Sequence, residues 1–240
     1  MNALLSTAYW PNLHYFYYVI NSETFVIEQF ENYQKQSFRN RTQLLTANGK
    51  LDLTIPINKT KQKQTITETE ISYKENWQLN HWRAITSAYK NSPYFDFFED
   101  EIYFFYNNNF KLLLEYNTEQ LKLILKLLKL KKEILFSTDF EKTPKNHFDF
   151  RNTIHPKIEF TKDQNVITIL NKPYYQTFEN KFNFPVCGTY CSMDESFDFL
   201  QMRLQHLNNI IYIYEQQNNK KYKNKRSTFF LKEIINLLKI

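Results

Sequence analysis

The side chain best suited to chemistry is His81, in the segment ENWQLNHWRAITSAYKNSPYF (residues 75–95). Helical spacing places Trp77 one turn before it, and Ala84 and Ala88 after it, on the same face. The small alanines would leave room for a ligand beside the imidazole, and an imidazole titrates near neutral pH, as a general acid or base requires. A histidine on an apolar face can equally be a core residue that hydrogen-bonds to a tyrosine or a carbonyl group. Both interpretations stay open.

A second candidate is the segment FRNRTQL, where Arg39 and Arg41 flank Asn40. If this segment is a strand, both arginines lie on one face, because side chains alternate along a strand. Two adjacent guanidinium groups suit a phosphate or a carboxylate through bidentate hydrogen bonds. The alternative is that they occupy the solvent-facing side of an edge strand.

Aromatic and amide side chains complete the candidate binding set. Tyrosine hydroxyls and rings bind sugars and nucleobases, although most of the 17 tyrosines must be core or boundary residues. The predicted substrate-binding residues are Tyr9, Pro11, Tyr15, Arg39, Asn40, Arg41, Trp77, Tyr89 and Gln176. Tyr33 and His155 are weaker candidates.

No metal site is predicted. Cys187 and Cys191 are four residues apart, and His206 does not complete a tetrahedral zinc site with them. Two cysteines also make no disulfide framework. A nucleophilic pair of either cysteine with His81 stays open.

Composition excludes several classes of protein. The chain has 240 residues and only two glycines, Gly49 and Gly188. The sequence therefore contains neither of the glycine-rich phosphate-binding patterns, G-x-G-x-x-G and G-x-x-x-x-G-K-[ST]. The net charge of +6 is mild, and the lysines of 122–132 and 220–226 are spread along amphipathic or linker segments, which disfavours a nucleic-acid binder. No signal peptide or transmembrane run is found, and we expect a cytoplasmic protein.

These residues must be positioned by strands followed by helices. We expect a buried strand at 3–9, a helix from Asn12, a strand at 24–29 and a hairpin joined by Asn48-Gly49. The alternating segment QTITETEIS (residues 64–72) predicts an edge strand, and helices follow between 76 and 132. The predicted fold class is α/β: a mixed β-sheet with a β-hairpin, covered by amphipathic helices, with a weaker α+β C-terminal part.

Several segments, in order, resemble the WbqC-like family: STAYWPNLHYFYYV, FENYQKQSFRNRTQL, GKLDLTIPI, ENWQLNHWRAITSAYKNSPYFDFF, FRNTIHPK and PYYQTFENKFNF. The resemblance implies one WbqC-like domain over 1–240, better matched over 1–135 and divergent over 136–240. The chain departs from the family at Thr7-Ala8-Tyr9, where a glutamine is usual before the turn, and around Cys187 and Cys191.

The family takes its name from surface-polysaccharide (O-antigen) gene clusters. The resemblance therefore implies a protein that helps to build or decorate sugars. Our own hypothesis is an enzyme that transfers an acyl or aminoacyl group to a nucleotide-activated sugar, with a sugar or acyl donor as ligand. We expect His81 to be its general acid or base, where the turn Tyr9-Trp10-Pro11 meets the arginine segment. The alternatives are a non-catalytic carbohydrate- or nucleotide-binding protein and, less favoured, a basic nucleic-acid-associated protein. No cofactor is indicated.

Overall fold

A computed structural model describes residues 2–58, 62–91, 95–127 and 130–156 of the chain. Its strands are β1 (Asn2–Ser6), β2 (Thr24–Glu28), β3 (Arg41–Thr46), β4 (Gly49–Thr54), β5 (Ile134–Phe136) and β6 (Phe148–Asp149). Its helices are α1 (Leu13–Asn21), α2 (Trp77–Tyr89), α3 (Phe95–Asn107) and α4 (Leu113–Leu127), with a 3₁₀ turn η1 (Ile66–Glu68).

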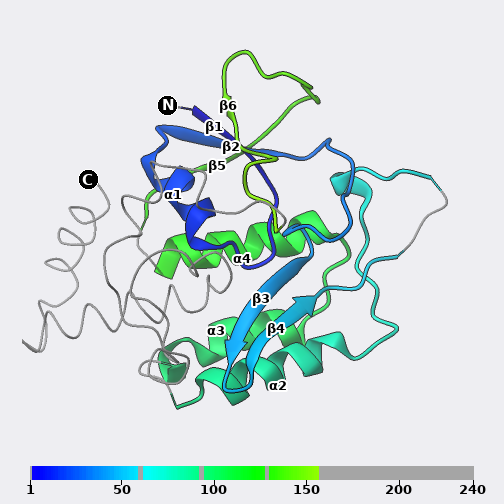
Figure 1. The fold of residues 1–240 in the computed structure, drawn as a ribbon, viewed down its shortest axis with the longest axis vertical. Coiled ribbons are helices and arrows are strands. Elements are labelled where there is room, and N and C mark those ends of the chain that lie inside the picture. The colour runs from blue at the N-terminus through cyan, green and yellow to red at the C-terminus, as the bar shows by residue number, and fades with distance from the viewer. Residues whose placement is uncertain (1, 59–61, 92–94, 128–129, 157–240) are drawn as a thin grey trace, which may run out of the picture.

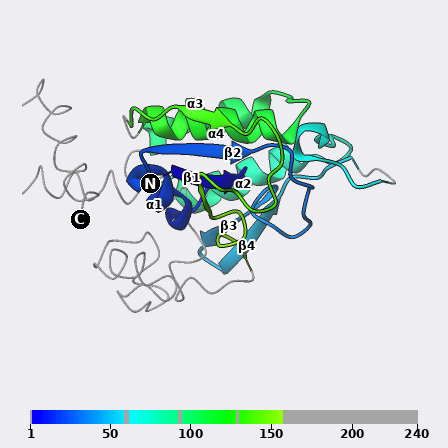
Figure 2. The ribbon, with the colours of Figure 1, turned by 90° about the horizontal axis from the view of Figure 1, so that it is seen from above.

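Four of the strands form a parallel sheet in the order β5-β2-β1-β6. The central strand β1 reads NALLS, and its Ala3, Leu4 and Leu5 are all buried. A parallel strand covered on both faces needs such a continuous apolar run. Figure 2 shows β1 and β2 between α4 on one side and α1 with the hairpin on the other.

The remaining strands, β3 and β4, form an antiparallel hairpin, which Figure 1 places near α2 and α3, away from the parallel sheet. Its turn is the predicted one shifted by a residue: Thr46 pairs with Gly49, and Ala47 and Asn48 form the loop. Gly49 has φ +107°, a conformation that side chains with a Cβ rarely adopt. The α/β class, with parallel and antiparallel strands and amphipathic helices, is confirmed, and the strands divide between two sheets.

The prediction of an edge strand at residues 64–72 is wrong. They form η1 and isolated bridges, one joining Glu70 to Leu112 at the start of α4. Thr65 and Glu68 make a reciprocal capping box, in which Glu68 accepts from the Thr65 backbone N–H (3.1 Å). Capping stabilises a helical turn locally, and it outweighs the two-residue alternation of this segment.

The helices follow their predicted apolar faces. Asn12 caps α1, and its side chain accepts from the Tyr15 N–H (3.0 Å). In α2 the buried positions are Trp77, His81, Ile85 and Tyr89, four residues apart. Residues 92–94, between α2 and α3, lie outside the described residues.

The turn after β1 carries backbone strain. Trp10 has φ +42°, in the left-handed region that non-glycine residues seldom occupy. Its backbone N–H donates to Gln120 of α4 (3.4 Å), its carbonyl accepts from Thr42 of β3 (3.4 Å) and its indole donates to Tyr106 of α3 (2.9 Å). Three elements thus hold the turn between the parallel sheet and the helices.

Candidate functional site

The parallel sheet has a topological switch point between β1 and β6. The chain runs outward from β1 to β2 and then β5, and returns to the opposite side of β1 with β6. In open sheets of this kind, ligands bind outside the carboxyl ends of the strands at the point where the strand order reverses. This edge is therefore where a site is expected.

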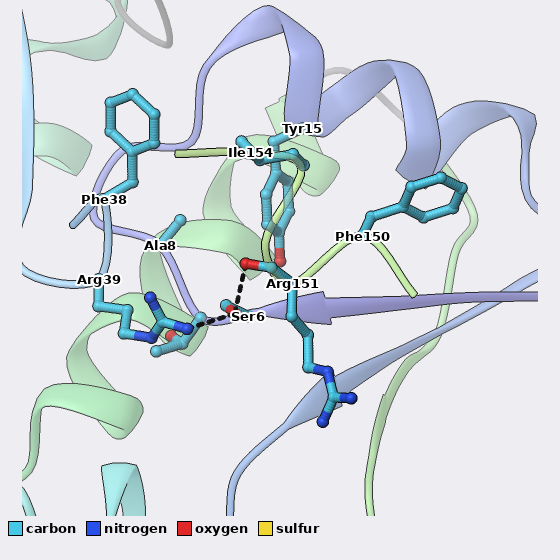
Figure 3. Close-up of a pocket in the computed structure, with 9 residues that line it drawn as sticks. Ser6, Ala8, Tyr15, Phe38, Arg39, Phe150, Arg151 and Ile154 are labelled. Atoms are coloured by element: carbon cyan, nitrogen blue, oxygen red, sulfur yellow. Dashed lines mark hydrogen bonds between the residues drawn. The ribbon is translucent and has the colours of Figure 1, made fainter. Parts of the chain in front are cut away.

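A small hollow lies at this edge, with a cavity volume of about 10 Å³, and it is partly open to solvent. We call it the switch-point hollow, and Figure 3 shows its lining. It is lined by Ser6, Thr7, Ala8, Tyr15, Phe38, Arg39, Phe150, Arg151 and Ile154. These residues come from the ends of β1 and β6, from α1 and from the turn before β3, so distant parts of the chain build it.

The polar floor of the hollow is centred on Ser6, the last residue of β1. Its Oγ accepts from Arg39 Nη2 (2.9 Å). The same oxygen lies 3.1 Å from Glu31 Oε2 and 3.4 Å from the Arg151 carbonyl oxygen, either of which can accept its hydrogen. Arg39 is 3% exposed, and its Nε and Nη2 both donate to the Glu31 carboxylate. Ser6 is therefore fixed by a buried, bidentate ion pair.

A second ion-pair group lies beside it. Arg151 donates to Glu28 at the end of β2 (3.1 Å), and to Asp149 of β6 (2.9 and 2.7 Å). Glu28 is 1% exposed, and it also accepts from Ser137 (2.7 Å). Removing one partner of a buried ion pair costs about 3–5 kcal/mol, because the other charge stays buried without compensation. We call the five residues Glu28, Glu31, Arg39, Asp149 and Arg151 the charged cluster.

Tyr15 is the one lining residue whose hydroxyl lacks a hydrogen-bond partner among the described residues. Its side chain is 2% exposed, and Figure 3 shows its hydroxyl directed toward Ser6 and the Arg151 backbone. Burial, and then the nearby Glu31 carboxylate, raise the pKa of this hydroxyl, so it stays protonated at physiological pH. It can both donate and accept a hydrogen bond. Leaving such a group unpartnered costs about 1–3 kcal/mol, which a ligand in the hollow would relieve.

The predicted catalytic residue, His81, lies elsewhere, in an aromatic cluster of the core. It is 6% exposed, and its Nδ1 lies 3.0 Å from the Tyr9 hydroxyl. The Tyr9 hydroxyl lies 3.0 Å from that of Tyr106, which accepts from the indole N–H of Trp10 (2.9 Å). Because an indole can only donate, every hydroxyl hydrogen finds an acceptor only if the chain runs from Trp10 through Tyr106 and Tyr9 to His81 Nδ1. This direction makes His81 an acceptor, with its own proton on Nε2.

Burial also lowers the pKa of His81 to about 4, so the ring is neutral at physiological pH. Trp77 packs edge-on against the imidazole, with ring centroids 5.2 Å apart. His81 does not line the switch-point hollow. Its contacts are those of a histidine that fixes aromatic packing.

The two arginines do not share a face, which corrects the sequence prediction. β3 begins at Arg41, and Arg39 lies in the turn before it, so strand alternation does not relate them. Arg41 forms a partly exposed ion pair with Asp52 across the hairpin, whereas Arg39 pairs with buried Glu31. Exposed pairs of the first kind contribute about 0–1 kcal/mol.

Of the other predicted binding residues, only Tyr15 lines the hollow together with Arg39. The Asn40 amide donates to the Ile55 carbonyl (2.8 Å) and holds the hairpin base. The remaining described members of the set are buried in the core region: Tyr9, Pro11, Trp77 and Tyr89. Tyr9 joins the two regions, because its backbone N–H donates to the Phe38 carbonyl (2.8 Å) while its side chain meets His81. Gln176, Cys187 and Cys191 lie outside the described residues.

Sequence reasoning missed Ser6, Glu28, Glu31 and Arg151 as site residues. A signal existed for the two glutamates, since both follow the apolar run TFVI at the end of a predicted strand. Arg151 stands in the segment FRNTIHPK, where the histidine had seemed the better candidate. No group of three or more metal-ligating side chains occurs among the described residues, and none of their helices is long and apolar enough to cross a membrane.

These features define an α/β protein with a parallel sheet and a polar hollow at the switch point of that sheet. The chain belongs to the WbqC-like protein family, whose model matches residues 7–229. A 94-residue segment is 31% identical to the uncharacterized protein Rv1507c of Mycobacterium tuberculosis (strain ATCC 25618 / H37Rv), covering 39% of this chain and 40% of that protein. The match thus spans less than half of that relative. No solved structure matches the chain.

Proposed function

We propose that this protein is an enzyme of surface-polysaccharide biosynthesis that binds an activated sugar in the switch-point hollow. The reaction we propose is the transfer of an acyl or aminoacyl group to that sugar. The main support for this proposal is the hollow. It lies where the strand order reverses, and the unpartnered Tyr15 hydroxyl is part of its lining. Membership of the WbqC-like family supports the sugar, because the family takes its name from surface-polysaccharide gene clusters.

The hollow has the mixed lining that small-molecule sites have. Ala8, Phe38 and Ile154 supply apolar surface, and Ser6 and Tyr15 supply hydroxyl groups. Sites for small molecules are lined mainly by apolar side chains, with a few polar groups that fix orientation. The ion pair of Arg39 with Glu31 keeps Ser6 in place beneath the substrate.

The test is a turnover assay with the full chain. Nucleotide-sugars are incubated with acyl-CoA or aminoacyl donors, and mass spectrometry detects an acylated sugar. We expect product with the wild type and a loss of at least tenfold with Tyr15→Phe. Tyr103→Phe is the matched control, because it removes an exposed hydroxyl on α3, away from the hollow. Equal turnover by Tyr15→Phe and wild type would remove the hollow from the mechanism.

A second candidate is a carbohydrate-binding protein without catalysis. It is favoured by the pairing within the charged cluster, where each carboxylate already accepts from an arginine. None of these described carboxylates is left as an unpaired general base. This candidate predicts that sugars bind in the hollow and that no donor yields a product.

A further inference from the structure

We propose that the switch-point hollow holds a neutral substituent of its ligand, such as one hydroxyl group of a sugar, and leaves the rest of the ligand and any phosphate outside. This inference rests on the proposed function, and it specifies which part of an activated sugar enters the site. Three observations carry it: the lining, the state of the arginines and the size of the hollow.

The described lining offers no free counter-charge to an ion of either sign. Its side chains include no aspartate or glutamate, so an ammonium group would meet no carboxylate on the walls. Its two cations are Arg39 and Arg151, and both are ion-paired. The charged cluster around them holds two arginines against three carboxylates, which disfavours an additional anion.

Four of the five N–H groups of each guanidinium already donate to other described residues. Arg39 donates to Glu31, Ser6 and Gln34. The Arg151 guanidinium donates to Glu28, Asp149 and the Glu141 carbonyl. Figure 3 shows it pointing away from the Tyr15 hydroxyl, while its backbone carbonyl faces Ser6. A phosphate needs several free donors, which this arrangement does not provide.

The helix that follows β1 does not substitute for these donors. The first turn of a helix offers unpaired N–H groups to phosphates in many nucleotide-binding proteins. Here the cap residue Asn12 does not line the hollow, and its side chain already accepts from the Tyr15 N–H. Pro11 before it has no N–H to offer.

The groups that do face the hollow match a neutral ligand. The Tyr15 hydroxyl is an unpartnered donor and acceptor, and the Ser6 hydroxyl and the Arg151 carbonyl lie beside it. A sugar hydroxyl or an acetamido group has the same mixture of donors and acceptors. The cavity volume of the hollow is about 10 Å³, room for about one water molecule, whereas a drug-sized ligand needs about 300–1,000 Å³. One small substituent, such as a hydroxyl group, fits this space, and a whole nucleotide-sugar does not.

The test uses the full chain with ¹³C-labelled tyrosine rings, and Tyr15→Phe assigns the Tyr15 signal. N-Acetylglucosamine is the neutral probe and inorganic phosphate is the anionic one. We expect the sugar to shift the Tyr15 signal, and phosphate neither to shift it nor to weaken sugar binding. Tyr15→Phe should bind the sugar about threefold to tenfold more weakly, the equivalent of one lost hydrogen bond. Tyr103→Phe should bind it like the wild type.

The outcomes separate this inference from the proposed function. If phosphate shifts the Tyr15 signal and competes with the sugar, the neutral-group inference is overturned while the hollow remains the site. If the sugar binds without affecting Tyr15, both the inference and the assignment of the hollow fail. If neither probe binds, the inference fails, and turnover of nucleotide-sugars in the assay above then decides the proposed function. Tyr15→Phe removes an unpartnered buried group, so its Tm should equal or exceed that of the wild type, which makes a loss of binding interpretable.

Discussion

At the scale of single residues, His81 and Tyr15 show how location and hydrogen-bond partners together distinguish a core residue from a site residue. Both side chains are buried and polar. His81 ends a chain of hydrogen bonds that starts at the Trp10 indole, and each described member of that chain has a partner. The Tyr15 hydroxyl has none among the described residues, and it faces the hollow. Trp77 and Tyr116 in the core also have polar atoms without a partner among the described residues, so Tyr15 is the better candidate for binding a ligand because its unpartnered hydroxyl lies in the wall of the hollow.

The first prediction concerns the pH dependence that His81 gives to stability. Its pKa is about 4 in the folded protein and 6.5 when unperturbed, so between these values the unfolded chain binds more protons. Stability should therefore rise with pH from about 4 to 6.5, and its His81 component should be complete above that window. The loss at the acid end is at most about 3 kcal/mol. Urea unfolding of the wild type across this range measures it.

His81→Asn provides the comparison, since it keeps an acceptor for the Tyr9 hydroxyl without a titrating ring. Its unfolding free energy should change less between pH 6.5 and 4.5 than that of the wild type. Because all other titrating groups are common to both proteins, the difference belongs to His81. Parallel pH profiles for the two proteins would contradict the buried, neutral histidine.

At the scale of elements, α4 is the support of the site. Asn117 on its buried face donates to Thr7 Oγ1 (3.1 Å) and to the Arg39 carbonyl (2.7 Å). One side chain thus fixes both the residue that follows Ser6 and the turn that carries Arg39. Gln120, one turn later, holds the Trp10 backbone. Asn117 and Gln120 therefore lie on the buried face of α4, where apolar residues are usual, and their hydrogen bonds fix the loops that follow β1 and precede β3.

We therefore predict that Asn117→Ala lowers both stability and ligand affinity. Losing its two buried hydrogen bonds should cost about 1–3 kcal/mol, because the partner groups stay buried. Calorimetric unfolding and N-acetylglucosamine titration measure the two effects. Asn80→Ala is the control: it lies exposed on α2, and its stability should stay within about 0.5 kcal/mol of the wild type. Unchanged stability in Asn117→Ala would show that α4 does not position the loops.

Local pattern predicted the elements better than the site. The buried faces of the helices, the hairpin and the short apolar strands depend on patterns that extend over only a few residues. The structure confirms these predicted elements. Residues 64–72 failed because the capping of Thr65 by Glu68 competed with alternation. The site failed for a different reason, since Ser6 meets Glu31 and Arg151 at sequence separations of 25 and 145 residues. Such contacts depend on strand order, which no local pattern determines.

At the scale of the whole molecule, the first and last parts of the described chain meet at the hollow. β6 and Arg151, near the end of the described residues, return beside β1, near its start. The hairpin and α2, by contrast, are built from residues close together in sequence. The hollow therefore exists only when the parallel sheet is complete, whereas the aromatic cluster around His81 is formed by α2, α3 and the turn after β1.

This separation gives a prediction for hydrogen exchange on the full chain. With N-acetylglucosamine bound, we expect slower exchange of backbone amides in residues 5–9, 37–40 and 149–155, three of the four segments that meet at the hollow. Residues 78–88 of α2, which contain His81, should exchange as in the free protein, and so should the hairpin tip at 46–50, which is remote from the ligand. Mass spectrometry of peptic fragments resolves these regions, and Tyr15→Phe at the same sugar concentration should show a weaker version of the same pattern. Protection confined to residues 78–88 would contradict this prediction. It would place the ligand beside His81 and support that histidine as the catalytic residue.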